Sequence, residues 1–243
     1  MSKILVIGES CKDVFVYGKV ERLEPAAPVP IVQTIRTNYN GGMAMNVKNN
    51  FTALGVDVDI LTNESWESIT KTRIVEHKTN HMFLRWDTGE DLYGRIDLKN
   101  VDYTKYSAIV ISDYNKGYLS IDDIQKVCNS HDLVFLDTKK PIGRWCEGAS
   151  FIKINKPELQ NAKEVTDIIK ERLIVTLGSS GASFRGELYP VTKTEVKDLS
   201  GAGDTFLAAL CAYYCETRNI HESIKHANKC ATMVVQKRGV STI

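Results

Sequence analysis

The segment "FIKINKPELQNAKEVTDIIKERLIVTLG", residues 151–178, has two short apolar runs separated by a helical pattern. Short runs of apolar and β-branched residues are typical of buried strands, and longer polar–apolar spacing between them favours helices. The alternation recurs in the strand patterns "KILVIG" (3–8), "VDVDILT" (56–62), "SAIVISD" (107–113) and "LVFLDT" (133–138), and in the helical patterns "AMNVKNNFTAL" (44–54) and "SIDDIQKVCNS" (120–130). It predicts an α/β fold with a doubly wound, mainly parallel sheet flanked by helices, and ligands at the carboxyl ends of the strands.

Two segments interrupt this alternation. Residues 14–39 contain proline clusters around a β-rich run, and residues 69–88 suggest two strands joined by a polar turn. We expect them to form a small sheet beside the main body, either a lid over a ligand or an ordinary peripheral hairpin. With 243 residues, 43% of them hydrophobic, the chain is long enough to bury one sizeable core, and we expect a single domain over 1–243.

Charge and cysteine content narrow the class of partner. The formal net charge is +1, from 31 basic and 30 acidic residues, and neither sign forms a long run, so we expect no nucleic-acid partner. The apolar run at the start is too short to span a membrane and lacks a secretion pattern, which predicts a cytoplasmic protein. The six cysteines have no paired CxxC spacing, which favours reduced structural thiols over a metal or disulfide site.

Two glycine-rich segments precede helical patterns. In "NYNGGMAMNVKNNFTALG" (38–55), Gly41 and Gly42 either admit a ligand close to the backbone or merely form a turn. In "KDLSGAGDTFLAALCAYYCE" (197–216), Gly201 to Gly203 precede a helix predicted from about Asp204 to Tyr214. A helix N-terminus can hold an anion, and Asp204 there is either a helix cap or a general base.

The order and spacing of these segments resemble the signatures of the ribokinase-like (PfkB) carbohydrate kinases. "GGMAMNVKNNFTALG" (41–55) is similar to the early sugar-side motif, and "DLSGAGDTF" (198–206) to the late catalytic motif. "NKPE" (155–158) resembles the N-x-x-E element, which organises magnesium and nucleotide phosphates, and "VTLGSSGA" (175–182) the nucleotide-side strand and turn. The resemblance implies a ribokinase-like fold with a small β lid and an ATP-dependent carbohydrate kinase.

Four further stretches resemble the kinase domain of the heptose-7-phosphate kinases, the first half of bifunctional enzymes that prepare ADP-heptose for lipopolysaccharide. They are "RLEPAAPVPIV" (22–32), "TKTRIVEHKTNHMFLRWD" (70–87), "SDYNKGYL" (112–119) and "LDTKKP" (136–141). The chain departs from that family in a much shorter connection between "VDILTN" (58–63) and "SITKTR" (68–73), and in ending at Ile243 without the nucleotidyltransferase half.

The resemblance also implies roles for individual residues. Asp204 is the base that takes the proton of the acceptor hydroxyl as it attacks the γ-phosphorus of ATP, and Gly201, Ala202 and Gly203 form the anion hole. Asp13, Gly41, Gly42 and Asn46 hold the sugar. A substrate phosphate needs a cationic clamp, for which the candidates are Arg85, Lys116 and Lys139, each with a solvated surface position as the alternative.

The resemblance also implies which residues bind the nucleotide: Asn155, Glu158, Thr176, Gly178, Gly181 and Asn228. Glu158 is expected to order Mg²⁺ through its water shell, with a first-turn helix charge as the alternative. Asp198, with the late "KRGVST" segment (237–242), resembles loops that bind a monovalent cation, which points to K⁺.

The leading function is therefore transfer of the γ-phosphate of ATP to D-glycero-D-manno-heptose 7-phosphate, giving the 1,7-bisphosphate. A kinase for another sugar or a nucleoside keeps the same chemistry, and the shortened connection leaves open a catalytically silent sugar-binding module. Pairing of the lid strands with those of a second chain predicts a homodimer.

Overall fold

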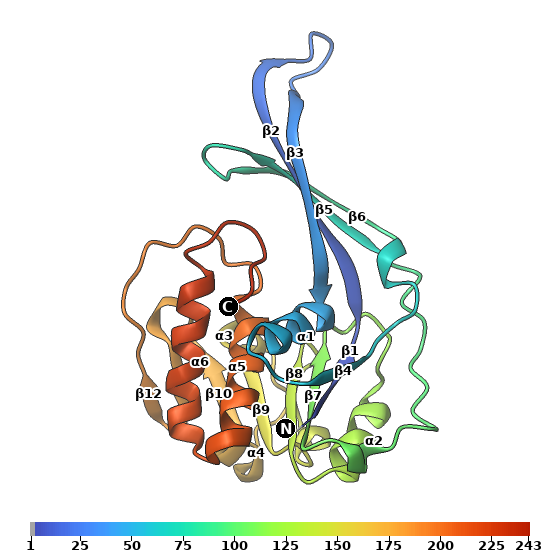
Figure 1. Cartoon of the computed structure of the whole chain (residues 1–243), viewed down its shortest axis with the longest axis vertical. Coiled ribbons are helices and arrows are strands. Elements are labelled where there is room, and N and C mark those ends of the chain that lie inside the picture. Colours follow the sequence, from blue (N-terminus) through green and yellow to red (C-terminus); the bar gives the residue numbers. More distant parts are fainter. Residues whose placement is uncertain (1–2) are drawn as a thin grey trace.

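The computed structural model describes residues 3–243, which form two β-sheets of unequal size (Figure 1). The larger sheet has eight strands in the order β12-β11-β10-β9-β8-β7-β1-β4. Neighbours pair in parallel from β4 to β10, and β11 and β12 extend the sheet in antiparallel pairing. The strands are β1 (Ile4–Gly8), β4 (Val58–Leu61), β7 (Ala108–Asp113), β8 (Val134–Thr138), β9 (Phe151–Asn155), β10 (Leu173–Thr176), β11 (Ala182–Phe184) and β12 (Glu187–Tyr189).

Helices cover both faces of this sheet, as the alternation of strands and helices predicts. On one face, α1 (Ala44–Ala53), α5 (Ala202–Thr217) and α6 (Ile220–Val234) pack against Ile4 and Val6 of β1. On the other face, α2 (Ile121–Ser130) and α4 (Asp167–Arg172) pack in a second core with Leu5 and Ile7. Because both faces of each central strand are buried, the strands are continuously apolar rather than alternating.

The helix expected between β9 and β10 is divided in two. Residues 156–160 form α3 (Lys156–Gln160), and α4 begins only at Asp167. Each piece has its own N-terminal cap: Asn155 caps α3, and the Thr166 side chain accepts a hydrogen bond from the Ile169 N–H. Two separate capping signals in this short stretch explain the division, because each favours a new helix start.

A four-stranded sheet, in the order β3-β2-β5-β6, stands beside the main body. Its strands are β2 (Ser10–Leu23), β3 (Pro30–Met43), β5 (Thr70–Glu76) and β6 (Met82–Thr88). The β2–β3 hairpin projects far beyond the other elements (Figure 1). These strands include the two segments that interrupt the sequence alternation, but β2 begins earlier and β3 ends later than 14–39, because β2 follows β1 almost directly and β3 runs into α1.

The two faces of the small sheet differ in character. The inner face is the one that carries Asp13, Lys71 and Asp87. Asp13 of β2 lies opposite Lys71 of β5, and Lys71 lies opposite Asp87 of β6. The outer face has exposed apolar residues, including Leu84 and Trp86 of β6. This period-two alternation is expected of a sheet with one covered face.

The connection between β4 and β5 is short, as the sequence indicates. It contains a single 3₁₀ turn, Trp66–Ser68. The remaining 3₁₀ turns lie at Tyr103–Lys105, Arg144–Cys146 and Gly178–Ser180.

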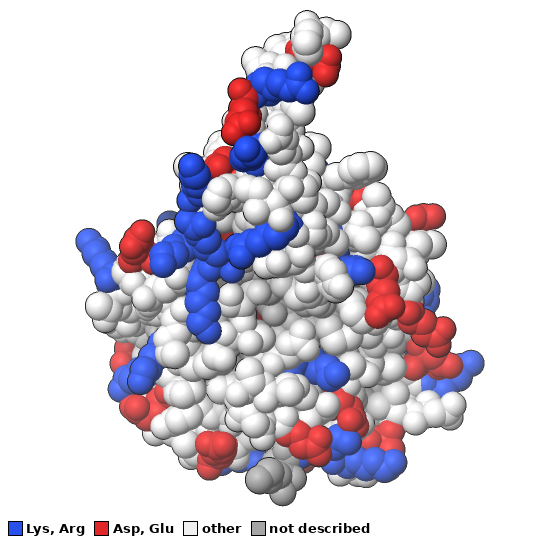
Figure 2. Space-filling view, turned by 45° about the horizontal axis from the view of Figure 1, so that its top comes forward, with Lys and Arg blue, Asp and Glu red and all other residues white. Residues whose placement is uncertain are grey.

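The distribution of charge, the cysteines and the hydropathy of the helices can be compared with the expectations from composition. Acidic and basic side chains are distributed over the surface, with a gathering of basic ones near the base of the hairpin (Figure 2). All six cysteines are free within residues 3–243. No helix in that range is long and apolar enough to cross a membrane.

Candidate active site

Asp204 joins the two glycine-rich segments. It lies in the first turn of α5, which begins after Gly201 in the left-handed conformation at φ 81°. One carboxylate oxygen, Oδ2, accepts a 2.8 Å hydrogen bond from Nδ2 of Asn46, and Oδ1 accepts a 2.7 Å bond from the Tyr114 hydroxyl. The Asp204 side chain is therefore bonded to α1 and to the residue after β7, and not to the backbone of its own helix as a cap would be.

Burial changes the acid–base properties of this cluster. Desolvation raises the pKa of Asp204 from 3.8 to about 6, although the hydrogen bonds from Asn46 and Tyr114 favour the carboxylate and oppose the shift. Desolvation also raises the pKa of Tyr114 well above its usual value, helped by the neighbouring charge of Asp204. Tyr114 thus stays a hydrogen-bond donor at neutral pH, while Asp204 can gain or lose a proton there, as a general base must.

A lysine reaches the N-terminus of α5. A Cβ on Gly203 would lie 3.1 Å from Nζ of Lys153, so the glycine allows the lysine to come close. Lys153 is buried in β9 and forms a 2.6 Å ion pair with Asp137 of β8. Gly201, Ala202 and Gly203 therefore combine a helix N-terminus with a fixed cation, and such an arrangement favours an anion.

The early glycines have a packing reason that the sequence does not reveal. A Cβ on Gly42 would lie 2.4 Å from Oδ2 of Asp13, and one on Gly41 would lie 2.1 Å from Cγ of Met45. Asp13 is buried and forms a 2.5 Å ion pair with Arg73. In this structure the missing side chains make room for Asp13 and Met45, and both glycines are themselves buried.

Asn155 and Glu158 form a reciprocal capping box at the start of α3. The Glu158 N–H donates to Asn155 Oδ1 at 2.9 Å, and the Asn155 N–H donates to Glu158 Oε2 at 2.8 Å. Glu158 also forms an ion pair with Lys139, whose pKa is raised because the nearby carboxylates of Asp137 and Glu158 outweigh the effect of burial. Glu158 thus has the contacts of a first-turn helix charge, the alternative to its magnesium role. It lies just beyond the end of β9, where the nucleotide is expected.

The donor set suits a magnesium ion held mainly by water and phosphate. Within residues 3–243 no group of three or more His, Cys, Asp or Glu side chains is placed to hold a metal. However, Oδ1 of the buried Asp137 has no hydrogen-bond partner in the described chain. Because Mg²⁺ commonly binds one or two carboxylates and keeps several waters, Asp137 and Glu158 fit that chemistry.

The other nucleotide-side residues lie at the ends of neighbouring strands. Thr176 ends β10 in register with Asn155. Gly178, at φ 59°, has open space where a Cβ would stand, whereas a Cβ on Gly181 would lie 2.0 Å from the Tyr189 carbonyl oxygen. Asn228 of α6 donates to the same carbonyl at 2.8 Å. Gly181 and Asn228 therefore have structural contacts of their own.

Asp198 connects the two segments expected at a monovalent cation. Its Oδ1 accepts from the Ser200 N–H at 2.8 Å, and its Oδ2 accepts from the Gly239 N–H at 3.1 Å. The adjacent Arg238 donates to the carbonyls of His77 and Lys78, in the turn between β5 and β6. The C-terminal segment is thus attached both to the segment that precedes α5 and to the small sheet.

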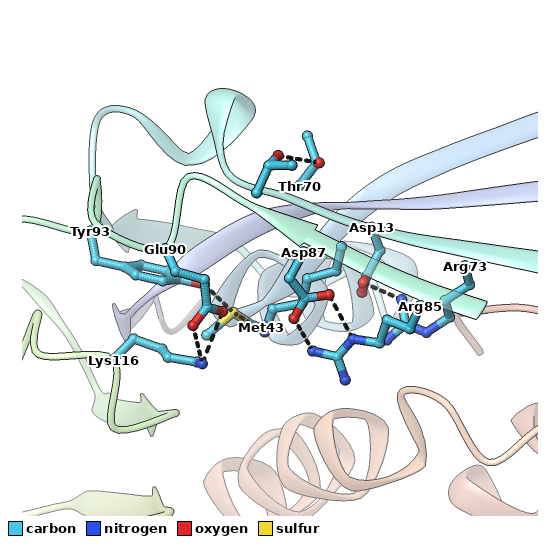
Figure 3. A network of polar contacts seen from close by, with 11 residues as sticks. Asp13, Met43, Thr70, Arg73, Arg85, Asp87, Glu90, Tyr93 and Lys116 are labelled. Atoms are coloured by element: carbon cyan, nitrogen blue, oxygen red, sulfur yellow. Dashed lines mark hydrogen bonds and ion pairs between the residues drawn. The ribbon is translucent and has the colours of Figure 1, made fainter.

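The three candidate phosphate clamps all have carboxylate partners. Arg85 donates to both oxygens of Asp87, at 2.8 and 2.6 Å, and Lys116 donates to both oxygens of Glu90, at 2.9 and 2.8 Å (Figure 3). Lys139 has Glu158, as described above. Each cation is at least partly neutralised by the chain itself.

Sequence reasoning missed Tyr114, Lys153, Arg73 and Lys71. Two features of the sequence could have identified the first two of these residues. Tyr114 immediately follows a strand, at the edge where ligands of parallel sheets bind. Lys153 interrupts the apolar run "FIKIN" (151–155), and a charged residue in a fully buried strand needs a partner or a function.

Comparisons with known proteins identify the family and the fold. The model of the pfkB family of carbohydrate kinases matches residues 48–243. The bifunctional protein HldE of Helicobacter pylori strain HPAG1 is 30% identical over 295 residues, covering 98% of this chain and 64% of that protein. HldE of Nitratiruptor sp. is 29% identical, covering 99% and 63%. The chain thus spans less than two thirds of these relatives. The alignment with the first is longer than the 243 residues here, so that relative has insertions where this chain has none.

Solved structures show the same fold at low sequence identity. Arabidopsis thaliana ribokinase, complexed with ribose and ATP, has a TM-score of 0.70 at 16% identity, covering 98% of this chain and 94% of that one. A mutant of Escherichia coli phosphofructokinase-2 has a TM-score of 0.70 at 12% identity, covering 100% and 96%. With its family match and its ribokinase fold, the chain belongs to the pfkB family of carbohydrate kinases.

Proposed function

We propose that this chain is an ATP-dependent sugar-phosphate kinase, with D-glycero-D-manno-heptose 7-phosphate as acceptor and the 1,7-bisphosphate as product. The observation that carries the proposal is the meeting of Asn46, Tyr114 and Asp204, which joins the early and late motifs within hydrogen-bond distance. The heptose acceptor is supported by the similarity to HldE over nearly the whole chain. A kinase for another sugar or a nucleoside, or a silent binding module, are the alternatives.

In the proposed reaction, Asp204 accepts the proton of the acceptor hydroxyl. The freed oxygen bonds to the γ-phosphorus of ATP while the bond to the bridging oxygen breaks, and ADP leaves. Asn46 and Tyr114 hold the Asp204 carboxylate in place, and Asp13 and Asn46 bind sugar hydroxyls. The N–H groups of the Gly201–Gly203 turn, with Lys153, offset the charge on the transferring phosphoryl group, since this reaction depends mainly on alignment and charge stabilisation.

The nucleotide is proposed to lie between the ends of β9 and β10 and the start of α5. Asn155, Thr176 and the open Gly178 turn are available to it, and Glu158 is available for magnesium through water. When bound, Mg²⁺ neutralises charge on the phosphates. We further propose that Asp198 and the C-terminal segment respond to K⁺, and that the protein acts in the cytoplasm, consistent with its free cysteines.

The activity test uses a panel of acceptors with ATP, following ADP release. Turnover of heptose 7-phosphate is expected, together with a loss of at least about 10³-fold in kcat in Asp204→Asn, because the variant has no base. Turnover of a pentose or nucleoside but not of the heptose phosphate would refute the acceptor. Equal turnover by wild type and Asp204→Asn would refute the role of Asp204, and no turnover of any acceptor would favour the silent module.

A homodimer through the small sheet is also proposed. Its outer face leaves large apolar side chains open to solvent, with Trp86 62%, Leu84 53% and Tyr39 68% exposed. Apolar patches of this kind often mark protein interfaces. Light scattering is expected to give a dimer for wild type and a monomer for Trp86→Glu. A monomeric wild type at micromolar concentration would contradict this interface.

A further inference from the structure

Lys71 is a buried cation on the inner face of the small sheet. Its side chain is among the buried charged groups, at 7% exposure. Nζ lies 3.5 Å from the sulfur of Met43 and 5.9 Å from the centroid of the Tyr114 ring. Among the described residues, no carboxylate oxygen lies within 4.0 Å of it.

The nearby carboxylates are already occupied. Asp13, opposite Lys71 on β2, pairs with Arg73, and Asp87, opposite Lys71 on β6, pairs with Arg85 (Figure 3). Lys71 and these neighbours on β2, β5 and β6 thus comprise three cations and two carboxylates. The other buried lysine of the described chain, Lys153, has its own aspartate.

An unpaired buried charge is unfavourable, and proteins seldom retain one without a partner or a function. The groups nearest to the Lys71 Nζ are a thioether and the face of an aromatic ring, and the Asp87 carboxylate acts on it only from beyond 4.0 Å. An anion that enters from outside the chain would supply the missing partner.

The position of Lys71 indicates which substrate brings that anion. Tyr114 lies between Lys71 and the reacting centre, because its ring faces Lys71 and its hydroxyl bonds to Asp204. The transferring phosphoryl group has a separate cation, Lys153, at Gly203. Lys71 is on the small sheet beside Asp13, on the acceptor side of Asp204.

We propose that Lys71 binds a phosphate group carried by the acceptor sugar, and that it thereby selects phosphorylated over unphosphorylated acceptors. The inference rests on the proposed sugar-phosphate kinase function and adds the residue that reads the phosphate. It replaces Arg85, Lys116 and Lys139 as the principal clamp, since each of those has a carboxylate partner within the chain.

The first test compares heptose 7-phosphate with unphosphorylated heptose. In Lys71→Met, KM for the phosphorylated acceptor is expected to rise about 30-fold, as for loss of a charge-assisted hydrogen bond, with kcat little changed. The kcat/KM for unphosphorylated heptose is expected to stay the same, and Lys71→Arg is expected to recover most of the loss. Lys126→Met, on the exposed side of α2, is the control. Unchanged selectivity in Lys71→Met, or equal losses with both acceptors, would overturn the proposal.

The second test needs no turnover. Sulfate, compared with chloride at equal ionic strength, is expected to raise the Tm of wild type more than that of Lys71→Met, which keeps only the anion site at Gly201–Gly203 and the general stabilising effect of the salt. Without added anion, Lys71→Met is expected to melt higher than wild type, because it removes an unpaired buried charge. Equal stabilisation of both proteins by sulfate would refute the site. If wild type turns over no sugar phosphate but sulfate acts through Lys71, the proposed function fails while the anion site stands.

Discussion

The hydroxyl of Tyr114 is expected to set the pH at which the enzyme becomes active. In Tyr114→Phe, Oδ1 of Asp204 loses its 2.7 Å donor while the carboxylate stays buried. A hydrogen bond to a charged group contributes about 1.5–3 kcal/mol, and about 1.4 kcal/mol corresponds to one pKa unit. The pKa of Asp204, already about 6, is therefore expected to rise by about one to two units.

The assay is the pH dependence of kcat/KM. Because the proposed base, Asp204, can accept a proton only when ionised, activity is expected to rise with pH through its pKa, and the acidic limb is expected to move to higher pH in the variant. At pH 7 this amounts to a loss of about two- to tenfold, largely recovered near pH 9. A merely structural role of the hydroxyl would lower activity at all pH values without moving the limb.

Tyr106→Phe is the matched control. It also removes a tyrosine hydroxyl bonded to a carboxylate, the 2.9 Å bond to Asp59, but that pair includes no residue of the candidate site. Its acidic limb is expected to coincide with that of wild type. If the limb of Tyr114→Phe also stays in place, the assignment of Asp204 as the titrating base through this contact is wrong.

Two further predictions concern stability. Asp204→Asn is expected to raise the free energy of unfolding at pH 7 by up to about 3 kcal/mol, because ionising a carboxyl with its pKa raised from 3.8 to about 6 disfavours the folded state. That difference, measured by denaturant titration, is present above pH 6 and disappears as the pH falls to about 4; a constant difference across this range would contradict it. Lys153→Met is expected to destabilise the protein by about 3–5 kcal/mol, since it leaves Asp137 buried without its cation. Adding Asp137→Asn is expected to recover most of that loss in Tm, and an additive further loss would show that the pair does not act as a unit.

The sequence was sufficient for the main sheet because its strands are buried on both faces. Runs such as "KILVIG" and "LIVTLG" are apolar throughout, which indicates a parallel sheet covered by helices. The helix between β9 and β10 was less predictable. Its apolar spacing continues through residues 161–166, although the caps at Asn155 and Thr166 divide it.

The grouping of residues in the candidate site was predictable where each belongs to a continuous motif, as for Asp204 and Asn46, whose side chains meet. It was not predictable where the chemistry depends on pairing between distant strands. Whether a lysine or arginine is neutralised depends on its partner across the sheet, so Arg85 and Lys71 look alike in sequence although only Arg85 has a carboxylate. Likewise, the need for Gly42 arises from Asp13 on the neighbouring strand.

The contacts of Asp204 also bear on the fate of ATP when no sugar is present. A kinase site that admits water can hydrolyse ATP without phosphorylating a sugar. Here, Asn46 and Tyr114 each donate to one oxygen of the Asp204 carboxylate, which leaves one lone pair on each oxygen for an incoming hydroxyl. We expect an acceptor with several contacts of its own to stay at that position longer than a water molecule does, which would keep ATP hydrolysis by the proposed kinase slow.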